Sequence, residues 1–565
     1  MARTVGIGHQ DFADVIQKNL FYVDKTAFIK EWWENEDSVT LITRPRRFGK
    51  TLNMSMLDYF FSNKHAGRGD LFEGLFIWQE EKYRKMQGTY PVISLSFANV
   101  KEQEYTGAKN RIFQIITGVY SNYEFLLDSD RLSENDKKFF RKIETDMAED
   151  NATVSLNHLA KCLYQHYGKK VIILLDEYDT PMQEAYVGGY WTQIALFIRE
   201  LFNSTFKTNP WLERAVMSGI TRVSKESIFS DMNHLEIVST TSNKYAKAFG
   251  FTEQEVFAAM DELGWTEKER VKAWYDGFTF GNVADIYNPW SIINYLDKGK
   301  FAAYWANTSS NSLVSMLLRE GSGKLKQQFW MLLEGGTIRS TIDEQIVYSQ
   351  LGQSEEAIWG LLLASGYLKV ISHQEITDMP EDWFEEPEYE LALTNGEVRM
   401  MFGSMVKGWF GKSRSDYNDF VKALLAGDLE AMNGYMNRVA LNTFSYFDTG
   451  KDPSGAQPEK FYHGFVLGLL VELKGRYRLT SNRESGFGRY DVMLEPLKQE
   501  DDAMILEFKV FNPRREQTLE DTVKAALAQI ETRKYEQALV DKGIEKGRIR
   551  KYGFACEGKE VLIGE

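Results

Sequence analysis

Three residues near the start of the chain have the types and the order needed to hold a phosphate group. Gly49, Lys50 and Thr51 follow the apolar run Val39–Thr43. A Gly-Lys-Thr turn between a strand and a helix points backbone N–H groups and a helix N-terminus at an anion. Lys50 would then reach the β- and γ-phosphates of a nucleotide, and the Thr51 hydroxyl would bind Mg²⁺. The alternative is a chance tripeptide that follows a strand and begins a solvated basic turn.

The first half of this loop departs from the usual pattern. A phosphate loop has glycine four residues before Phe48, where this chain has Arg44. A residue other than glycine in the left-handed region costs roughly 1–2 kcal/mol, so the first turn of the loop should differ in shape. We expect Arg46, Arg47 and Phe48 to complete the nucleotide-binding loop, with Arg44 adding a further positive charge toward a triphosphate.

A second candidate is a pair of acids at the end of an apolar strand. The run Val171–Leu175 is followed directly by Asp176 and Glu177. Such a run is typical of a central parallel strand, and ligands of open α/β sheets bind at the carboxyl ends of those strands. Asp176 would share Mg²⁺ with Thr51, and Glu177 would polarise the water that attacks the γ-phosphate. Alternatively, the two acids merely begin a loop.

The run 215–222 indicates another strand of the same sheet. Ser218 or Thr221 could sense the γ-phosphate and Arg222 could contact it, or these residues could cap the next turn. The segment Asn243–Ala246, Asn-Lys-Tyr-Ala, lacks the final acid of an Asn-Lys-x-Asp guanine-reading motif. The nucleotide expected is therefore ATP rather than GTP.

A third candidate lies near the C-terminus. The sequence predicts a hairpin whose second strand begins at Asp491, followed by a strand with Glu507 and Lys509 two residues apart and therefore on one face. Asp491 and Glu507 would bind Mg²⁺, which neutralises a phosphodiester and lowers the pKa of a bound water. Lys509 would orient or activate that water, and Glu459 on the preceding helix would complete the metal site. A Glu-x-Lys pair alone is weak evidence, because exposed strands often alternate such charges.

Composition limits the class of protein. The 565 residues suggest three or four domains, and 43% hydrophobic residues suffice for large cores. The formal charge of −14 argues against a protein coated in nucleic acid by charge alone. Two cysteines form no disulfide or metal framework, and no apolar run approaches the ~20 residues that span a bilayer. We expect a soluble cytoplasmic protein with no membrane association.

The motifs together resemble a known family. Tyr22–Thr26, Arg44–Thr51 and Leu175–Asp179 are similar to motifs of the AAA-ATPase-like proteins of bacteria and archaea that carry a C-terminal PD-(D/E)XK nuclease-type domain. The resemblance implies an α/β protein: a P-loop NTPase parallel sheet with a helical lid and a winged-helix-like region, then an α/β restriction-endonuclease-like domain. Gln529 and Tyr535 match the closing helix of such nucleases and would support the site.

We place the domain boundaries as follows: the P-loop domain at 1–250, the lid at 251–340, the helical and winged-helix-like connector at 341–450 and the nuclease-like domain at 451–565.

The leading hypothesis is an ATP-dependent or ATP-gated nuclease that uses Mg²⁺. By family analogy its substrate is nucleic acid, with DNA favoured over RNA, and a role in defence or mobile-element biology is compatible with this pairing. A homo-oligomer is also considered, because a neighbouring subunit's arginine could contact the γ-phosphate in place of Arg222. The rival hypothesis is a non-catalytic nucleotide-dependent switch whose nuclease-like tail is inactive.

Overall fold

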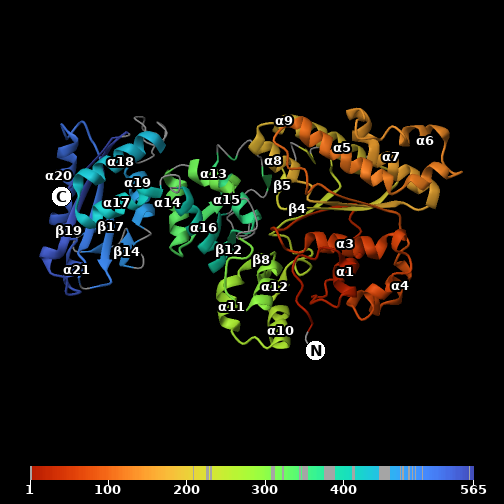
Figure 1. Ribbon diagram of the computed structural model, residues 1–565, viewed down its shortest axis with the longest axis horizontal. Helices are drawn as coiled ribbons and strands as arrows, with labels where there is room; N and C mark the ends of the chain where they lie inside the picture. The colour runs from red at the N-terminus through yellow and green to blue at the C-terminus, as the bar shows by residue number, and fades with distance from the viewer. Residues whose placement is uncertain are drawn as a thin grey trace, which may run out of the picture. The chain divides into compact units, whose positions relative to one another are not determined.

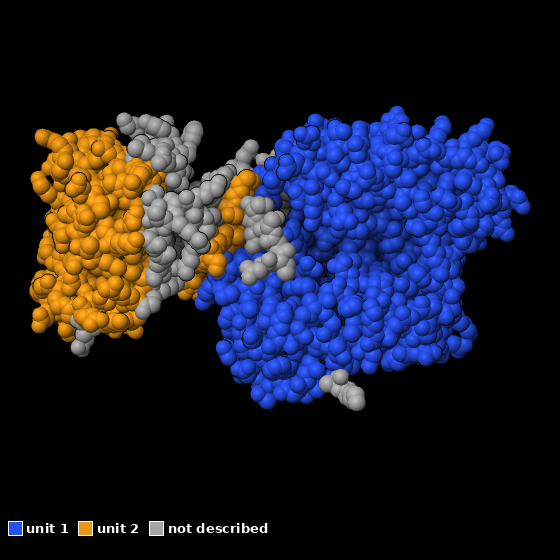
Figure 2. Space-filling view, in the orientation of Figure 1, with its two compact units in different colours: residues 1–313, 337–401 blue, residues 314–336, 402–565 orange. Residues whose placement is uncertain are grey.

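The computed structural model describes most of the chain. The described residues are 3–207, 209–223, 228–229, 232–306, 312–320, 323–342, 345–346, 351, 354–373, 388–409, 414–443, 458–470, 473, 476–481, 484–485, 488–489, 491–498, 500–558 and 560–565. They form two compact units, one of residues 1–313 and 337–401 and the other of residues 314–336 and 402–565 (Figure 2). The four-part division expected above stays a prediction. Among the described residues, no helix is long and apolar enough to cross a bilayer.

The first unit is built on a parallel five-stranded sheet of order β2-β3-β4-β1-β6. Every residue of β1 and β3 is buried, as their uninterrupted apolar sequence predicts for strands covered on both faces. Helices α5 and α7 lie on one side of the sheet and α1 and α3 on the other (Figure 1). The strands are β1 (Val39–Thr43), β2 (Val92–Ser96), β3 (Val171–Asp176), β4 (Leu212–Gly219) and β6 (Leu235–Val238). The helices are α1 (Phe12–Gln17), α2 (Ala27–Asn35), α3 (Lys50–Phe61), α4 (Glu81–Met86), α5 (Tyr105–Ser121), α6 (Glu134–Phe140), α7 (Glu149–Tyr167), α8 (Thr180–Gly188) and α9 (Trp191–Phe202).

A smaller antiparallel sheet with three helices follows in the chain. It begins at β7, which runs directly into α10, where Thr252 and Glu255 form the reciprocal capping box that their spacing predicts. Its last helix, α12, starts with Asn288 as the N-cap and Pro289 in the first turn. The elements are β7 (Phe251–Thr252), α10 (Glu253–Leu263), α11 (Lys268–Tyr275), β8 (Phe278–Phe280), β9 (Val283–Tyr287) and α12 (Pro289–Lys298), with sheet order β7-β9-β8.

The winged-helix-like region completes the first unit. Helix α15 runs into strand β12, and β12 pairs with β13 as an antiparallel hairpin in a sheet of order β10-β13-β12. A short parallel pair, β5 with β11, ties this region to the chain that follows β4. The elements are β5 (Arg222–Val223), β10 (Ile338–Thr341), β11 (Gln345–Ile346), α15 (Glu355–Ala364), β12 (Leu368–His373), β13 (Glu388–Leu393) and α16 (Gly396–Trp409), of which α16 continues into the second unit.

The second unit packs helices on a mixed five-stranded sheet of order β14-β17-β18-β19-β20. Only the β18–β19 pairing is parallel. One core cluster joins α17, α18 and α19 to the sheet, and a second joins the sheet to α20 and α21. The helices are α13 (Ser312–Glu320), α14 (Gly323–Leu333), α17 (Arg414–Ala426), α18 (Leu429–Thr443), α19 (Pro458–Leu470), α20 (Leu519–Arg533) and α21 (Gln537–Val540). The strands are β14 (Tyr477–Ser481), β15 (Glu484–Ser485), β16 (Gly488–Arg489), β17 (Val492–Pro496), β18 (Ala503–Val510), β19 (Ile549–Glu557) and β20 (Glu560–Gly564).

This architecture confirms the fold class expected from the sequence: a parallel α/β sheet, a helical and winged-helix-like region, and a C-terminal α/β domain.

Candidate active sites

The predicted phosphate loop joins β1 to α3. Gly49 adopts a left-handed conformation with φ 81° directly before Lys50, the first residue of α3. The Lys50 ammonium is only 4% exposed and donates to the carbonyls of Arg44 (2.9 Å) and Pro45 (3.0 Å). Neutral carbonyl groups hold this charge across the loop, so an anion that enters the loop can bind it without first breaking an ion pair with a protein carboxylate.

Arg44 does not extend toward a ligand, and the expectation that it adds charge to the phosphate site is wrong. Its side chain is fully buried and donates to the carbonyls of Thr43, Val238 and Ser239 at 2.9, 3.3 and 2.6 Å. The guanidinium also lies 4.3 Å from the ring centre of Phe280. Arg44 therefore fixes the first turn of the loop to the end of β6. As expected, the first turn of the loop differs in shape from the usual pattern: Arg44 does not have a positive φ, and the left-handed residue is Arg47, at 65°.

Arg46, Arg47 and Phe48 of the loop each contact a different neighbour. Arg46 contacts the Gln183 amide oxygen at 3.4 Å. The Arg47 guanidinium lies 4.5 Å from the ring centre of Trp290. Phe48 is buried, with its ring centroid 4.8 Å from that of Phe278. The Phe48 side chain therefore anchors the loop, and only its main chain remains for a phosphate.

The predicted magnesium ligands of the first site meet at the sheet edge. Thr51 Oγ1 donates to Asp176 Oδ2 at 2.7 Å, and the Ser218 hydroxyl donates to the other oxygen of the same carboxylate. Burial and the neighbouring Glu177 raise the pKa of Asp176, against the opposing effects of the two hydroxyl groups and Lys50. A buried carboxylate beside a hydroxyl is the oxygen donor set that Mg²⁺ prefers, so these residues fit that cation.

Glu177 directly follows β3, and Arg222 lies shortly after the end of β4. Glu177 has a positive φ of 52°, and its carboxylate accepts from Thr180 Oγ1 at 3.2 Å. Arg222 is half-buried and begins β5, where it pairs in register with Gln345. Their roles toward a nucleotide stay predictions.

Asp179 is a buried acid for which we predicted no function. Its Oδ2 accepts from the backbone N–H groups of Ile220 (3.0 Å) and Thr221 (2.9 Å) and from the Thr221 hydroxyl (2.9 Å). Asp179 thus shapes the turn after β4, at the edge that carries Asp176. Its signals in the sequence were its place at the end of the Leu175–Asp179 motif and its position three residues after Asp176.

The second candidate site forms on one face of the C-terminal sheet. Val492 of β17 pairs with Leu506 of β18, so the antiparallel register places Asp491 opposite Glu507. The Asp491 carboxylate accepts from the Phe508 N–H at 2.8 Å. The two predicted metal-binding acids therefore lie at the same end of a strand pair.

A hydrogen-bonded chain links the remaining predicted residues. Lys509 Nζ donates to Gln529 Oε1 at 2.7 Å, and Gln529 Nε2 donates to Glu507 and, at 3.1 Å, to the Tyr535 hydroxyl. Gln529 on α20 thus holds both members of the Glu-x-Lys pair on β18. The sequence reasoning had selected all four of these residues, and the fold brings them together.

Burial and charge distinguish this second site from a solvated strand. Glu507 is 2% exposed, and burial raises the pKa of Asp491 to about 6 although the Phe508 N–H and Lys509 oppose the rise. A buried and a half-buried carboxylate beside a single lysine fit a divalent cation, because its charge would offset the cost of removing them from water. Glu459 lies in α19, but its side chain is outside the described part of the structure.

His463 is a residue that the sequence reasoning missed. It is 6% exposed on α19, and its Nε2 lies 3.0 Å from the Asp491 carbonyl and 3.1 Å from Ser481 Oγ. Burial lowers the pKa of this imidazole, which favours a neutral ring. His463 fixes the backbone that presents Asp491. Its position four residues after Glu459 was the only available signal.

Comparisons with known proteins match the two parts of the chain that carry these sites. Residues 6–229 match the family model described as a predicted AAA-ATPase, and residues 457–565 match the model of the PD-(D/E)XK nuclease superfamily. The chain is also 27% identical over 399 residues to a protein of Azotobacter chroococcum mcd 1 described as "Uncharacterized protein in vnfD 5'region". That similarity covers 70% of this chain and 69% of the relative.

Proposed function

Because residues 6–229 form a domain of the predicted AAA-ATPase family and residues 457–565 a domain of the PD-(D/E)XK nuclease superfamily, we propose that the protein is an ATP-dependent nuclease. The proposal rests chiefly on the Asp491–Glu507–Lys509 constellation, in which Glu507 is buried, the other two residues are half-buried, and Gln529 joins Glu507 to Lys509. A decayed site would have no reason to keep a buried acid opposite a second acid and beside a lysine held by Gln529. The substrate is nucleic acid, with DNA favoured over RNA.

In the nucleotide site, each residue has a distinct task. Lys50 leaves the loop carbonyls to bind the β- and γ-phosphates, and Thr51 with Asp176 would hold Mg²⁺. Main-chain N–H groups of Phe48 and Gly49 complete the phosphate cradle together with the N-terminus of α3. Glu177 receives the proton of the attacking water, and Arg222, or an arginine of a second copy in a homo-oligomer, contacts the γ-phosphate.

In the nuclease site, Asp491 and Glu507 would hold Mg²⁺. A bound Mg²⁺ offsets the charge of the phosphodiester and makes a coordinated water more acidic. Lys509 orients the attacking water, and the Gln529 amide fixes the lysine at a set distance from Glu507. Asp491 must be ionised to bind a cation. His463 positions the backbone of Asp491, and the Phe508 N–H positions its carboxylate.

We further propose that ATP controls the nuclease through the helical lid. Asn288, the N-cap of α12, donates to the Arg46 carbonyl at 3.1 Å, and Trp290 of the same helix contacts Arg47. A nucleotide that draws either arginine toward its phosphates would alter the attachment of α12. The helical lid is thus the element that would transmit nucleotide binding to the rest of the protein.

The test is degradation of plasmid DNA and of RNA with Mg²⁺, with and without ATP. Cleavage by the wild type and its loss in both Asp491→Ala and Lys509→Ala support the enzyme. Lys524→Ala is the matched control, because this exposed lysine lies on α20 next to Asp521 and away from the site. No cleavage of any substrate by the wild type would favour the rival function, a nucleotide-dependent switch with an inactive tail.

Nucleotide binding is tested separately by calorimetric titration with ATP. Lys50→Ala should abolish binding, because it removes the only side-chain ammonium held across the loop. An unchanged ATP affinity in this variant would contradict the assignment. A role in defence or mobile-element biology remains a prediction that neither experiment addresses.

A further inference from the structure

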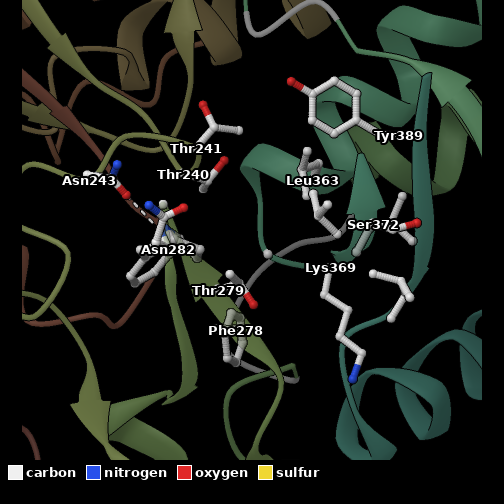
Figure 3. Close-up of a pocket in the computed structure, with 17 residues that line it drawn as sticks. Thr240, Thr241, Asn243, Phe278, Thr279, Asn282, Leu363, Lys369, Ser372 and Tyr389 are labelled. Carbon is white, nitrogen blue, oxygen red and sulfur yellow. Dashed lines mark hydrogen bonds between the residues drawn. The ribbon is translucent and has the colours of Figure 1, made fainter. Parts of the chain in front are cut away.

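A pocket of about 380 Å³ lies beside the phosphate loop in the first unit (Figure 3). Three segments enclose it: the chain that follows β6, the strand β8 with its turn, and the wing strands β12 and β13. Pro45 of the phosphate loop forms part of its wall. Its volume is within the range of about 300–1,000 Å³ typical of small-molecule sites.

The two walls of the pocket differ in chemistry. Thr240, Thr241, Asn243 and Asn282 lie on one side and supply hydroxyl and amide groups, whereas Leu363 and the Tyr389 ring lie on the other side together with Ser372 (Figure 3). Asn243 is held in place because its Oδ1 accepts from the Asn282 N–H at 2.7 Å. Amide and hydroxyl groups read the edges of nucleobases, and an apolar or aromatic wall covers their faces.

The charges on the pocket wall restrict further which ligands can bind there. None of the 17 lining residues is a carboxylate, and the only cation is Lys369. The ammonium of Lys369 turns away from the polar wall, toward Gly277 (Figure 3). The part of a ligand that fits here is therefore uncharged, with donors and acceptors along one edge.

Pro45 joins this pocket to the phosphate loop. Its carbonyl accepts from Lys50 Nζ at 3.0 Å, so the pocket begins at a residue that holds the phosphate-binding lysine. Gly366, between α15 and β12, packs so tightly on the other side that an added Cβ would lie 2.7 Å from Pro45 Cγ. The pocket wall and the loop are thus in direct contact.

We propose that this pocket holds the nucleoside of the nucleotide whose phosphates bind at Lys50. The inference rests on the proposed nucleotide binding and extends it to the base. Adenine is preferred to guanine, because none of the lining residues that the structure describes is a carboxylate that could accept from the N1–H and the amino group of guanine. The wing residues Tyr389 and Ile371 then close over the nucleoside, so the winged-helix-like region registers whether the nucleotide site is filled.

The same chemistry would suit a separate nucleoside, and titration distinguishes the two sources. Thr241→Phe fills the polar side of the pocket, and Ile371→Trp fills the opposite side from a residue that is 50% exposed. Thr106→Phe, at an exposed position of α5, is the matched control. ATP, GTP, adenosine and inorganic tripolyphosphate, which lacks a nucleoside, are each titrated into the full chain by calorimetry, with circular dichroism to confirm folding.

We expect both filling variants to bind ATP at least tenfold more weakly than the wild type and to bind tripolyphosphate equally well. In the wild type, ATP should bind more tightly than GTP, and saturating ATP should prevent adenosine binding. Adenosine that still binds beside saturating ATP would assign the pocket to a separate nucleoside and overturn the proposal. Unchanged ATP affinity in both filling variants would overturn this inference alone, whereas a wild type that binds neither ATP nor tripolyphosphate would overturn the nucleotide site itself.

Discussion

A cluster of acids in the lid region should make the stability of the protein depend on pH. One oxygen each from Glu253, Asp276 and Asp285 can be chosen so that all lie within 4.8 Å of one another. Lys272 is the neighbouring cation, with its Nζ 2.5 Å from Glu253 and 3.4 Å from Asp285. Burial, and then a hydrogen bond with Asp285, raise the pKa of Asp276 to about 7.

The sign of the effect follows from where the proton is bound. Between about pH 4 and pH 7 the folded state keeps the Asp276 proton, whereas the unfolded state has lost it. The free energy of unfolding therefore falls as pH rises through this window, and the loss is complete above pH 7. At 1.36 kcal/mol per pKa unit the full effect would be about 4 kcal/mol. Because Asp276 is only partly buried, solvent screening should reduce it to ~1–2 kcal/mol.

The perturbation that tests this is Asp276→Asn. The amide keeps the shape of the side chain and can still donate to Asp285, but it never carries a charge. The variant should be more stable than the wild type by ~1–2 kcal/mol at pH 8 and close to it at pH 4. Urea unfolding of the full chain, followed by circular dichroism at both pH values, measures the difference. Asp130→Asn, at an exposed position, is the control for loss of one negative charge.

The reasoning would be refuted if the Asp276→Asn variant were less stable than the wild type at pH 8. Equal effects of the substitution at pH 4 and pH 8 would also refute it, because a proton held in the folded state must produce a difference between them.

Three further substitutions test other contacts. Arg44→Met should lower the free energy of unfolding by about 2–4 kcal/mol in urea, because one carbonyl group at the end of β1 and two at the end of β6 lose their donor; an unchanged stability would contradict the buried role of Arg44. Gly219→Ala should cost about 1–3 kcal/mol, since its Cβ would lie 2.6 Å from the Tyr178 ring, whereas Gly118→Ala on α5, with open space around it, should be neutral or slightly stabilising. Gln529→Leu should reduce cleavage about 10–100-fold without unfolding α20, and equal activity would show that Lys509 needs no such support.

Much of the fold could be predicted because its signals are local. The apolar runs of β1 and β3 each indicate a strand buried on both faces, and the acids at the end of β3 indicate where that strand reaches the edge of the sheet. The alternation of Glu507 and Lys509 likewise fixes which face of β18 they share. Because Asp491 directly precedes β17, the antiparallel pairing of β17 with β18 places it near Glu507 with little freedom.

The remaining features depend on partners that lie far along the chain. His463 is placed by the carbonyl of Asp491, which is 28 residues away, and Asp179 by the turn at Thr221, 42 residues away. No periodicity or spacing reports such contacts, because the partner is a backbone group that every residue possesses. The Asn243–Ala246 segment shows the same limit: the missing acid was visible in the sequence, but the position of Asn243 on a pocket wall was not.

The arginines of the phosphate loop show how a departure from a pattern can be accommodated. Burying a guanidinium is costly unless other contacts offset the cost, and Arg44 offsets part of it because its Nη1 donates to carbonyls from β1 and the end of β6 and its guanidinium lies over the Phe280 ring. The left-handed conformation falls instead at Arg47, where it costs roughly 1–2 kcal/mol relative to glycine. The contact of Arg47 with Trp290 offsets part of that cost, at roughly 0.5–2 kcal/mol for a cation over an indole. Two glycines would make the loop easier to form, but they would remove its attachments to β6 and α12, and those attachments are what would let the nucleotide act on the lid.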